Sequence, residues 1–257
     1  MRRAEPKIWS SLRHWWIRER ESKNAVDAAR NLVGIFWEFA RESTPERRRR
    51  RYGDAEYDWA RRVNTTSGGV GAHSRFLGLL HSEYQPIEAE IFRDIMERLL
   101  DHLNSNSAPD SHRRAACATF TFVDIGSGKG RAILLAAEHP FRRIIGIELL
   151  PELHAIAMRN VADLNARESL KSAIELQCGD AAQFTFPLEP LVVFVFNPLP
   201  EAGLRKVVTN LEASLRELWR PLFVIYVNPV HEEIIAGCSG LRKFGGTHQY
   251  SVFESVW

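Results

Sequence analysis

The sequence of 257 residues is poor in the features that mark secreted, metal-binding or membrane proteins. Its three cysteines, Cys117, Cys178 and Cys238, form no CxxC pair. Such an odd and sparse set predicts reduced thiols rather than a disulfide framework, which favours the cytoplasm. No apolar stretch approaches the length of a membrane span, and residues 1–22 carry charges throughout, so they lack the apolar core of a secretory signal.

Internal repeats are also lacking, and the Arg47–Arg51 run is the one biased tract. The net charge of +2 conceals an asymmetry, because residues 1–62 hold 16 Lys/Arg against 10 Asp/Glu, whereas the rest holds 18 against 22. A basic N-terminal quarter favours an acidic partner, a nucleic acid or a membrane surface. Its tryptophans are typical of helix packing, and docking of an Arg-flanked amphipathic helix on a membrane surface is the alternative.

The hydrophobic pattern changes along the chain. It predicts helices in residues 5–42, a polar, loop-like stretch from Pro45 to Ser74, and a helix around Ile87–Leu99. The predicted strands that follow are Thr119–Asp124, Arg143–Glu148, Ala173–Cys178, Leu191–Phe196, Leu222–Val227 and Tyr250–Glu254. The predicted helices between them are Lys129–Glu138, Pro151–Arg167, Glu201–Leu218 and Val230–Ala236. This alternation predicts an α/β fold with a doubly wound, mostly parallel sheet, and a ligand beyond the carboxyl ends of its strands.

Three glycines at alternate positions, Gly126, Gly128 and Gly130, follow the first predicted strand and open a helix. Glycine tolerates unusual φ and lets a ligand touch the backbone, although a tight turn without a ligand is the alternative. A phosphate-binding P-loop would need a glycine at Val123, and a nucleophile elbow would need wider spacing around Ser127. A dinucleotide fingerprint would need a glycine at position 131, which is Arg.

Two carboxylates accompany the glycines. Glu148 ends the second predicted strand, where a carboxylate suits a ribose diol. Asp124 lies two residues before the first glycine, where it could hold an ammonium group, which nicotinamide cofactors lack. This charge pattern favours an amino acid joined to a nucleoside, without phosphate.

Four segments, "VDIGSGKG", "GIELL", "QCGDAAQF" and "VFVFNPLP", stand in this order between about Tyr84 and Val230. They resemble successive motifs of class I S-adenosylmethionine-dependent methyltransferases. The resemblance implies a Rossmann-like, seven-stranded sheet in residues 76–257. The charge and the helical pattern of residues 1–75 predict a basic helical extension or cap. The resemblance also implies S-adenosyl-L-methionine as cofactor, bound by Asp124, Gly126, Ser127, Gly128, Gly130, Glu148, Leu149, Asp180, Ala181 and Asn197. No metal is expected, because His231 lacks a second histidine at helical spacing.

Two further segments bear on which kind of molecule accepts the methyl group. "HSEYQP" places Tyr84 before the domain, where its aromatic ring could close over the methionine end of the cofactor. Asn197, in "FNPLP", would lie near the transferable methyl group. Both residues are expected to be catalytic. "FNPLP" resembles the Asn-Pro-Pro-aromatic motif of nucleic-acid methyltransferases but has Leu199 and Pro200 in place of the second proline and the aromatic ring. The loss of that base-stacking ring argues against a nucleic-acid acceptor.

The approach segment with Tyr84 resembles non-SET protein-lysine methyltransferases, and "YVNPVH", Tyr226 to His231, resembles a bacterial set of methyltransferases. We therefore expect a methyltransferase, with a protein amino group (lysine) favoured as acceptor. A small-molecule acceptor is one alternative. The other is a non-catalytic, S-adenosylmethionine-binding partner subunit.

Overall fold

The structure is a computed structural model that describes residues 55–66, 86–105, 115–168, 170, 172–196 and 199–256. The chain divides into two compact units: Met1–Ala55 with Thr66–Gln85, and Glu56–Thr65 with Pro86–Trp257. The first unit lies almost wholly outside the described residues. The helices expected in residues 5–42, the Arg47–Arg51 run and the expected boundary at residue 75 also lie outside them and stay predictions.

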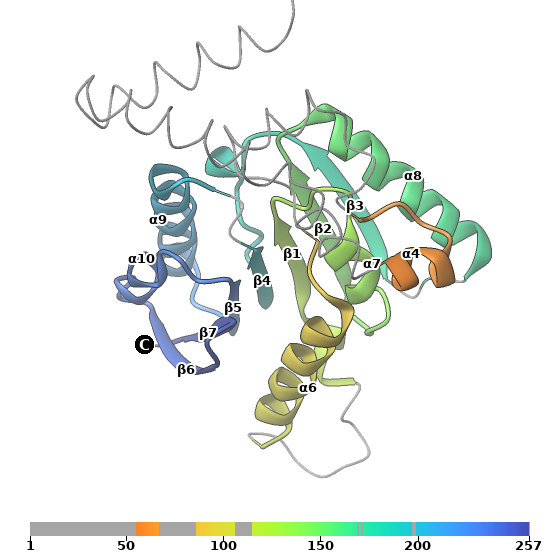
Figure 1. The fold of residues 1–257 in the computed structure, drawn as a ribbon. Coiled ribbons are helices and arrows are strands. Elements are labelled where there is room, and N and C mark those ends of the chain that lie inside the picture. The colour runs from red at the N-terminus through yellow and green to blue at the C-terminus, as the bar shows by residue number, and fades with distance from the viewer. Residues whose placement is uncertain are drawn as a thin grey trace, which may run out of the picture. The chain divides into compact units, whose positions relative to one another are not determined.

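A seven-stranded sheet forms the centre of the second unit (Figure 1). Its strands are β1 (Thr121–Ile125), β2 (Arg143–Glu148), β3 (Ala173–Cys178), β4 (Leu191–Phe196), β5 (Leu222–Val227), β6 (Leu241–Gly246) and β7 (Tyr250–Ser255). Their order across the sheet is β3-β2-β1-β4-β5-β7-β6. Strands β1 to β5 pair in parallel, whereas β7 pairs antiparallel with both β5 and β6. The predicted α/β class is confirmed, and the sheet is mixed at one end.

The helices of this unit are α4 (Ala55–Arg61), α6 (Ala89–Ser105), α7 (Arg131–Ala136), α8 (Pro151–Arg167), α9 (Glu201–Glu217) and α10 (Glu232–Ala236), with short 3₁₀ turns η2 (Ala115–Thr119) and η3 (Ala181–Gln183). Helix α8 begins at Pro151 because proline has no N–H to leave unpaired at a first helical position. Its bounds are those predicted from the sequence.

One face of the sheet is covered by α6 and α7. Phe122, Ile144 and Val192 of three neighbouring strands belong to the same buried cluster as Phe92 of α6 and Ile133 of α7. Successive residues of a strand point to opposite faces, so the alternate positions of these strands form one continuous apolar layer.

The opposite face is covered by α9 and α10 (Figure 1). Val123, Ile145 and Val193 pack there with Leu211 of α9 and Ile234 of α10. Both faces are therefore buried, which is why β4 and β5 are continuous apolar runs rather than alternating patterns.

Two elements were not predicted. The stretch from Pro45 to Ser74, expected to be a loop, contains helix α4, which is too short to be stable by its own propensity and depends on tertiary contacts. Strand β6 was missed because its residues, LRKFGG, include two charges and two glycines. Such residues suit an edge strand, where one side faces solvent, and the register shift between Lys243 and Gly245 also belongs to an edge.

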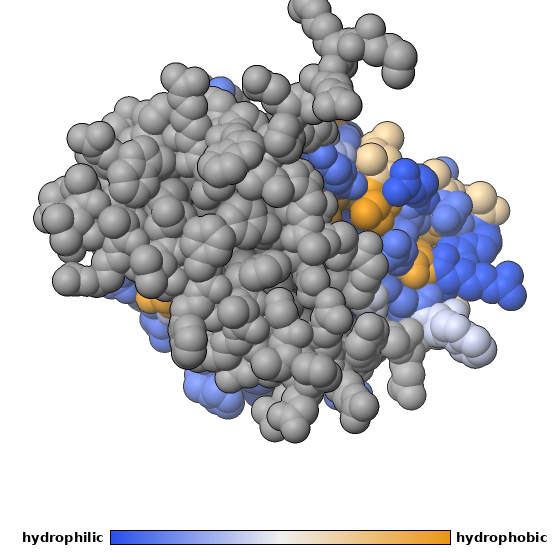
Figure 2. Space-filling view, turned by 45° about the horizontal axis from the view of Figure 1, so that its top comes forward, coloured by the Kyte–Doolittle hydropathy of each residue, from blue (hydrophilic) through white to orange (hydrophobic). Residues whose placement is uncertain are grey.

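The surface of the described residues is mostly hydrophilic in the view of Figure 2, with small apolar areas between polar ones. Among the helices of the described ranges, none is both long and apolar enough to cross a membrane.

Candidate functional site

The strand order places a topological switch point between β1 and β4. The chain proceeds from β1 outward to β2 and β3, then returns to the other side of β1 with β4. In open α/β sheets, ligands bind outside the carboxyl ends of the strands at such a point, because the connecting loops diverge there. Residues 126–130 follow β1 directly, so the structure puts the predicted glycine loop at this position.

The glycine loop, Gly126 to Gly130, has a backbone that favours its three glycines. Gly126, Gly128 and Gly130 all have positive φ, at 77°, 55° and 86°. A Cβ on Gly130 would also lie 3.3 Å from the Cβ of Ala157 in α8. The alternating glycines therefore allow three left-handed residues in a short turn and a close approach of α8.

The first half of the loop is bonded to the end of β2. The backbone N–H groups of Gly126 and Ser127 both donate to the carbonyl of Ile147, at 2.9 Å each. Gly128 N donates to Oε2 of Glu148 at 2.8 Å. Glu148, the residue predicted to bind the ribose, therefore also supports the glycine loop.

Glu148 is buried and its two oxygens both accept backbone hydrogen bonds. Oε1 accepts from Leu150 N at 2.8 Å, and Oε2 accepts from Gly128 N. Burial raises the pKa of Glu148, and the backbone N–H groups of Leu150, Gly128 and Leu149 partly oppose that rise. Each carboxylate oxygen can accept more than one hydrogen bond, so hydroxyl donors can still be received. Leu149 itself is 42% exposed beside this carboxylate.

Asp124 lies near the end of β1 and is 3% exposed. Burial, and then the negative charge of Glu148, raise its pKa to about 8. Among the described residues, none donates a hydrogen bond to its carboxylate, so its charge has no partner there. A buried carboxylate without a cation is costly, and a ligand that brings a positive charge would remove that cost.

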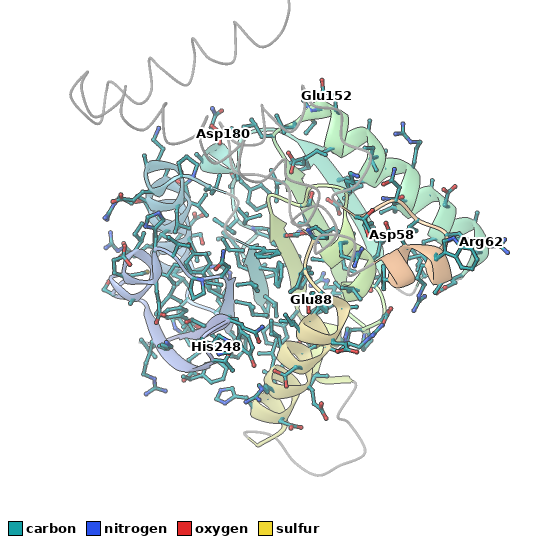
Figure 3. The ribbon with its side chains drawn as sticks, in the orientation of Figure 1. Asp58, Arg62, Glu88, Glu152, Asp180 and His248 are labelled. Carbon is teal, nitrogen blue, oxygen red and sulfur yellow. The ribbon has the colours of Figure 1, made fainter. Side chains whose placement is uncertain are left out.

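Asp180 and Ala181 follow β3 at the same edge of the sheet. Figure 3 places Asp180 near this edge, together with Glu152 at the start of α8. Asp180 caps η3, since its Oδ1 accepts from Ala182 N at 2.9 Å, and Ala181 is buried. The structure therefore brings Asp124, the glycine loop, Glu148, Leu149, Asp180 and Ala181 to the carboxyl ends of β1, β2 and β3.

The two residues predicted to be catalytic, Tyr84 and Asn197, lie outside the described residues. Strand β4 ends at Phe196, immediately before Asn197. The "YVNPVH" motif is described and makes the turn after β5: Asn228 has φ of 50°, and the hydroxyl of Tyr226 accepts from His231 N at 3.3 Å.

The sequence reading missed two buried cations next to the glycines. Lys129 and Arg131 are 1% and 2% exposed, although charged residues are rarely buried without partners. Their contacts come from Asn64, Thr65, Asp58 and Tyr57, in the stretch expected to be a loop. The sequence does contain one signal of a buried cation: Arg131 is the first residue of an otherwise apolar helix, RAILLA.

No protein-family model matches the chain, and the search of curated proteins found no similar sequence. The search of solved structures found methyltransferases. An RNA methyltransferase from Salinibacter ruber in complex with S-adenosyl-L-homocysteine is 19% identical with a TM-score of 0.39, over 66% of this chain and 92% of that one. The magnesium protoporphyrin IX methyltransferase of Synechocystis, with bound S-adenosylmethionine, is 14% identical with a TM-score of 0.45, over 80% and 92%.

A ribosomal protein L11 methylase from Lactobacillus delbrueckii is 17% identical with a TM-score of 0.39, over 58% of this chain and 81% of that one. The names of these three proteins indicate acceptors of different chemical class: RNA, a porphyrin and a ribosomal protein. The likeness is distant, with 14–19% identity and TM-scores of 0.39–0.45.

Proposed function

We propose that the chain is an S-adenosylmethionine-dependent methyltransferase. The proposal rests on one observation: two buried carboxylates, Asp124 and Glu148, flank a glycine loop at the ends of adjacent parallel strands. One carboxylate has no described partner, and the other is oriented by backbone N–H groups. A ligand with an ammonium group and a ribose diol, and without phosphate, satisfies both.

The residues present fit this cofactor. Asp124 would accept hydrogen bonds from the ammonium of the methionine part, and its carboxylate would ionise in doing so. Glu148 would accept from the ribose hydroxyls with the lone pairs that its backbone donors leave free. Ser127 and the glycines would lie along the methionine part. Leu149 would lie at the ribose, and Asp180 with Ala181 beside the adenine.

When bound, S-adenosylmethionine supplies an electrophilic methyl group on a sulfonium. The protein's task is then to orient the acceptor in line with that methyl and to exclude water. We propose that Asn197, at the end of β4, orients the acceptor and that Tyr84 closes over the methionine end. We further propose a protein amino group as the acceptor, supported by the resemblance of the Tyr84 segment to non-SET protein-lysine methyltransferases.

Calorimetry with S-adenosyl-L-homocysteine, the demethylated product, tests the cofactor. We expect the wild-type protein to bind it, and we expect Asp124→Asn and Glu148→Gln to weaken binding. Asp163→Asn, which removes an exposed carboxylate from α8, is the matched control and should bind as the wild type does. If the folded wild-type protein does not bind this ligand, the proposed function is wrong.

Transfer of a tritiated methyl group to fractions of a cell lysate, followed by mass spectrometry of the labelled species, tests the acceptor. Label on a lysine side chain would support the protein acceptor, whereas label on a metabolite would indicate a small-molecule enzyme. Asn197→Ala should abolish transfer even when S-adenosylmethionine is supplied at a saturating concentration, which compensates for any cofactor contact that Asn197 makes. Binding without transfer to any fraction would indicate a non-catalytic partner subunit instead.

A further inference from the structure

Helix α4 and the residues after it, Glu56 to Thr65, belong to the compact unit that contains the sheet, although the chain before and after them belongs to the other unit. We call residues 56–65 the anchor segment. Asp58 lies on the side of α4 that is turned toward α7, whereas Arg62 is on its outer side (Figure 3). Several contacts of this segment are made with Lys129 and Arg131, which follow the second glycine of the loop.

Arg131, directly after Gly130, is held by three residues of the anchor segment. Its Nη2 donates to Oδ1 of Asp58 at 3.0 Å, and its Nε donates to the hydroxyl of Thr65. Its guanidinium carbon lies 4.4 Å from the centre of the Tyr57 ring, which is a cation–π distance. A guanidinium that is 2% exposed needs such partners, because an unpaired buried charge is strongly unfavourable.

Asp58 also closes the anchor segment on itself. Its Oδ2 accepts from Thr65 N at 2.6 Å, and its Oδ1 accepts from the Thr65 hydroxyl. The same carboxylate therefore fixes both ends of the segment and receives Arg131. This arrangement makes the position of Arg131 depend on the turn that Asp58 and Thr65 close.

A second connection runs through Asn160 of α8. Its Nδ2 donates to the carbonyl oxygens of both Lys129 and Asn64, at 2.9 and 3.0 Å, and its Oδ1 accepts from Asn64 N at 2.9 Å. Lys129 Nζ donates to Oδ1 of Asn64 at 3.1 Å. One buried amide thus joins the backbone of the glycine loop to the backbone of the anchor segment.

The two halves of the loop therefore have different supports. Gly126, Ser127 and Gly128 are bonded to the end of β2, whereas Lys129 and Arg131 are bonded to the anchor segment. We propose that three residues of the anchor segment, Asp58, Asn64 and Thr65, are a working part of the cofactor site: they are positioning residues that hold the glycine loop in its binding conformation through Lys129 and Arg131.

This inference rests on the proposed function, since it concerns the same loop. A turn with three left-handed residues is readily distorted when its supports are removed, because other backbone conformations are open to glycine. If loss of the anchor contacts reduces the binding-competent fraction of the loop to one tenth, the observed affinity for the cofactor falls about tenfold. The positioning residues need not touch the cofactor for this effect.

The test uses the full chain and three variants. Asp58→Asn removes the charge that pairs with Arg131, and Arg131→Lys keeps the charge but loses the forked geometry and the ring contact. Asn64→Ala removes only the side-chain contact to Lys129. Arg61→Gln is the matched control: it removes exposed ion pairs of the same helix with Glu138 and Glu168, at 2.7 and 2.9 Å, and leaves the loop contacts intact.

Two quantities are measured for each protein: the hydrogen-exchange rate of the amides in residues 126–131, and the affinity for S-adenosyl-L-homocysteine. We expect faster exchange in the loop and about tenfold weaker binding in Arg131→Lys, with a smaller effect of the same sign in Asn64→Ala. Exchange in β4 should stay at the wild-type rate, because a merely global loss of stability would accelerate exchange there as well. Arg61→Gln should match the wild type in both measurements.

The outcomes separate this inference from the proposed function. Wild-type exchange in the loop of Arg131→Lys and Asn64→Ala, with unchanged affinity, would overturn the inference and leave the proposed function standing. Should Asp58→Asn fail to fold, the other two variants decide. If the wild-type protein does not bind the ligand at all, the proposed function fails, and the exchange rates alone decide whether the segment holds the loop.

Discussion

The raised pKa of Asp124 makes cofactor affinity depend on pH in a calculable way. The carboxyl group has a pKa of about 8 in the absence of ligand because it is buried and near Glu148. Only the ionised form can pair with a ligand ammonium, so binding at neutral pH must expel the carboxyl proton. The observed affinity is then the intrinsic affinity multiplied by the ionised fraction.

The magnitude follows from that fraction. With a pKa of about 8, roughly one hundredth of the carboxyl groups are ionised at pH 6 and one half at pH 8, so affinity for S-adenosyl-L-homocysteine should rise about 50-fold between them. The range ends at pH 8 because the ligand's own amine loses its proton at higher pH. At pH 7, about 0.9 proton should be released for each ligand bound.

Isothermal titration calorimetry in buffers of different ionisation enthalpy measures both the affinity and the released proton. The matched ligand is 5′-methylthioadenosine, which has the ribose and adenine but no amino acid. It should show a weaker pH dependence, to which Glu148 can contribute but the Asp124–ammonium pair cannot. Asp124→Asn should bind S-adenosyl-L-homocysteine more weakly and without the steep rise. An affinity of the wild-type protein that is flat from pH 6 to 8, without proton release, would refute this reasoning.

Three further predictions concern the loop, an ion pair and the thiols. Gly130→Ala should lower the free energy of unfolding by about 1–2 kcal/mol in urea titrations, because the φ of Gly130 is +86°. Gly179→Ala is the control: a Cβ there meets open space, so its free energy of unfolding should stay within about 0.5 kcal/mol of the wild-type value. The bond to Lys243 lowers the pKa of Glu232, so Glu232→Gln should lower the free energy of unfolding by under about 1 kcal/mol at pH 7. The difference in stability between this variant and the wild type should vanish as the pH falls through that lowered pKa. A thiol reagent should label Cys178 rapidly in the native protein and the two buried cysteines only after unfolding, as mass spectrometry of the labelled peptides would report.

The bounds of four strands and one long helix could be predicted because their signals are local. Strands β2 to β5 and helix α8 have the predicted bounds. In β4 and β5 a continuous apolar run is bordered by proline or polar residues, and α8 begins at a proline. Strand β1 begins at Thr121 rather than Thr119, since the residues before it form η2. Boundaries of this kind depend on competing hydrogen-bond patterns that the apolar run alone does not distinguish.

The sequence by itself determined the α/β class, the glycine loop and the two carboxylates that flank it. Each of these follows from neighbouring residues: strand periodicity, glycine spacing, and the rule that the carboxyl ends of parallel strands meet at one edge. Tertiary structure alone decided that a helix forms at Ala55–Arg61, and that Asp58 and Thr65 pair with an arginine 73 and 66 residues away. The physical reason is burial. A seven-residue helix and a buried guanidinium are each unstable alone, and they become stable only when the folded chain brings them together.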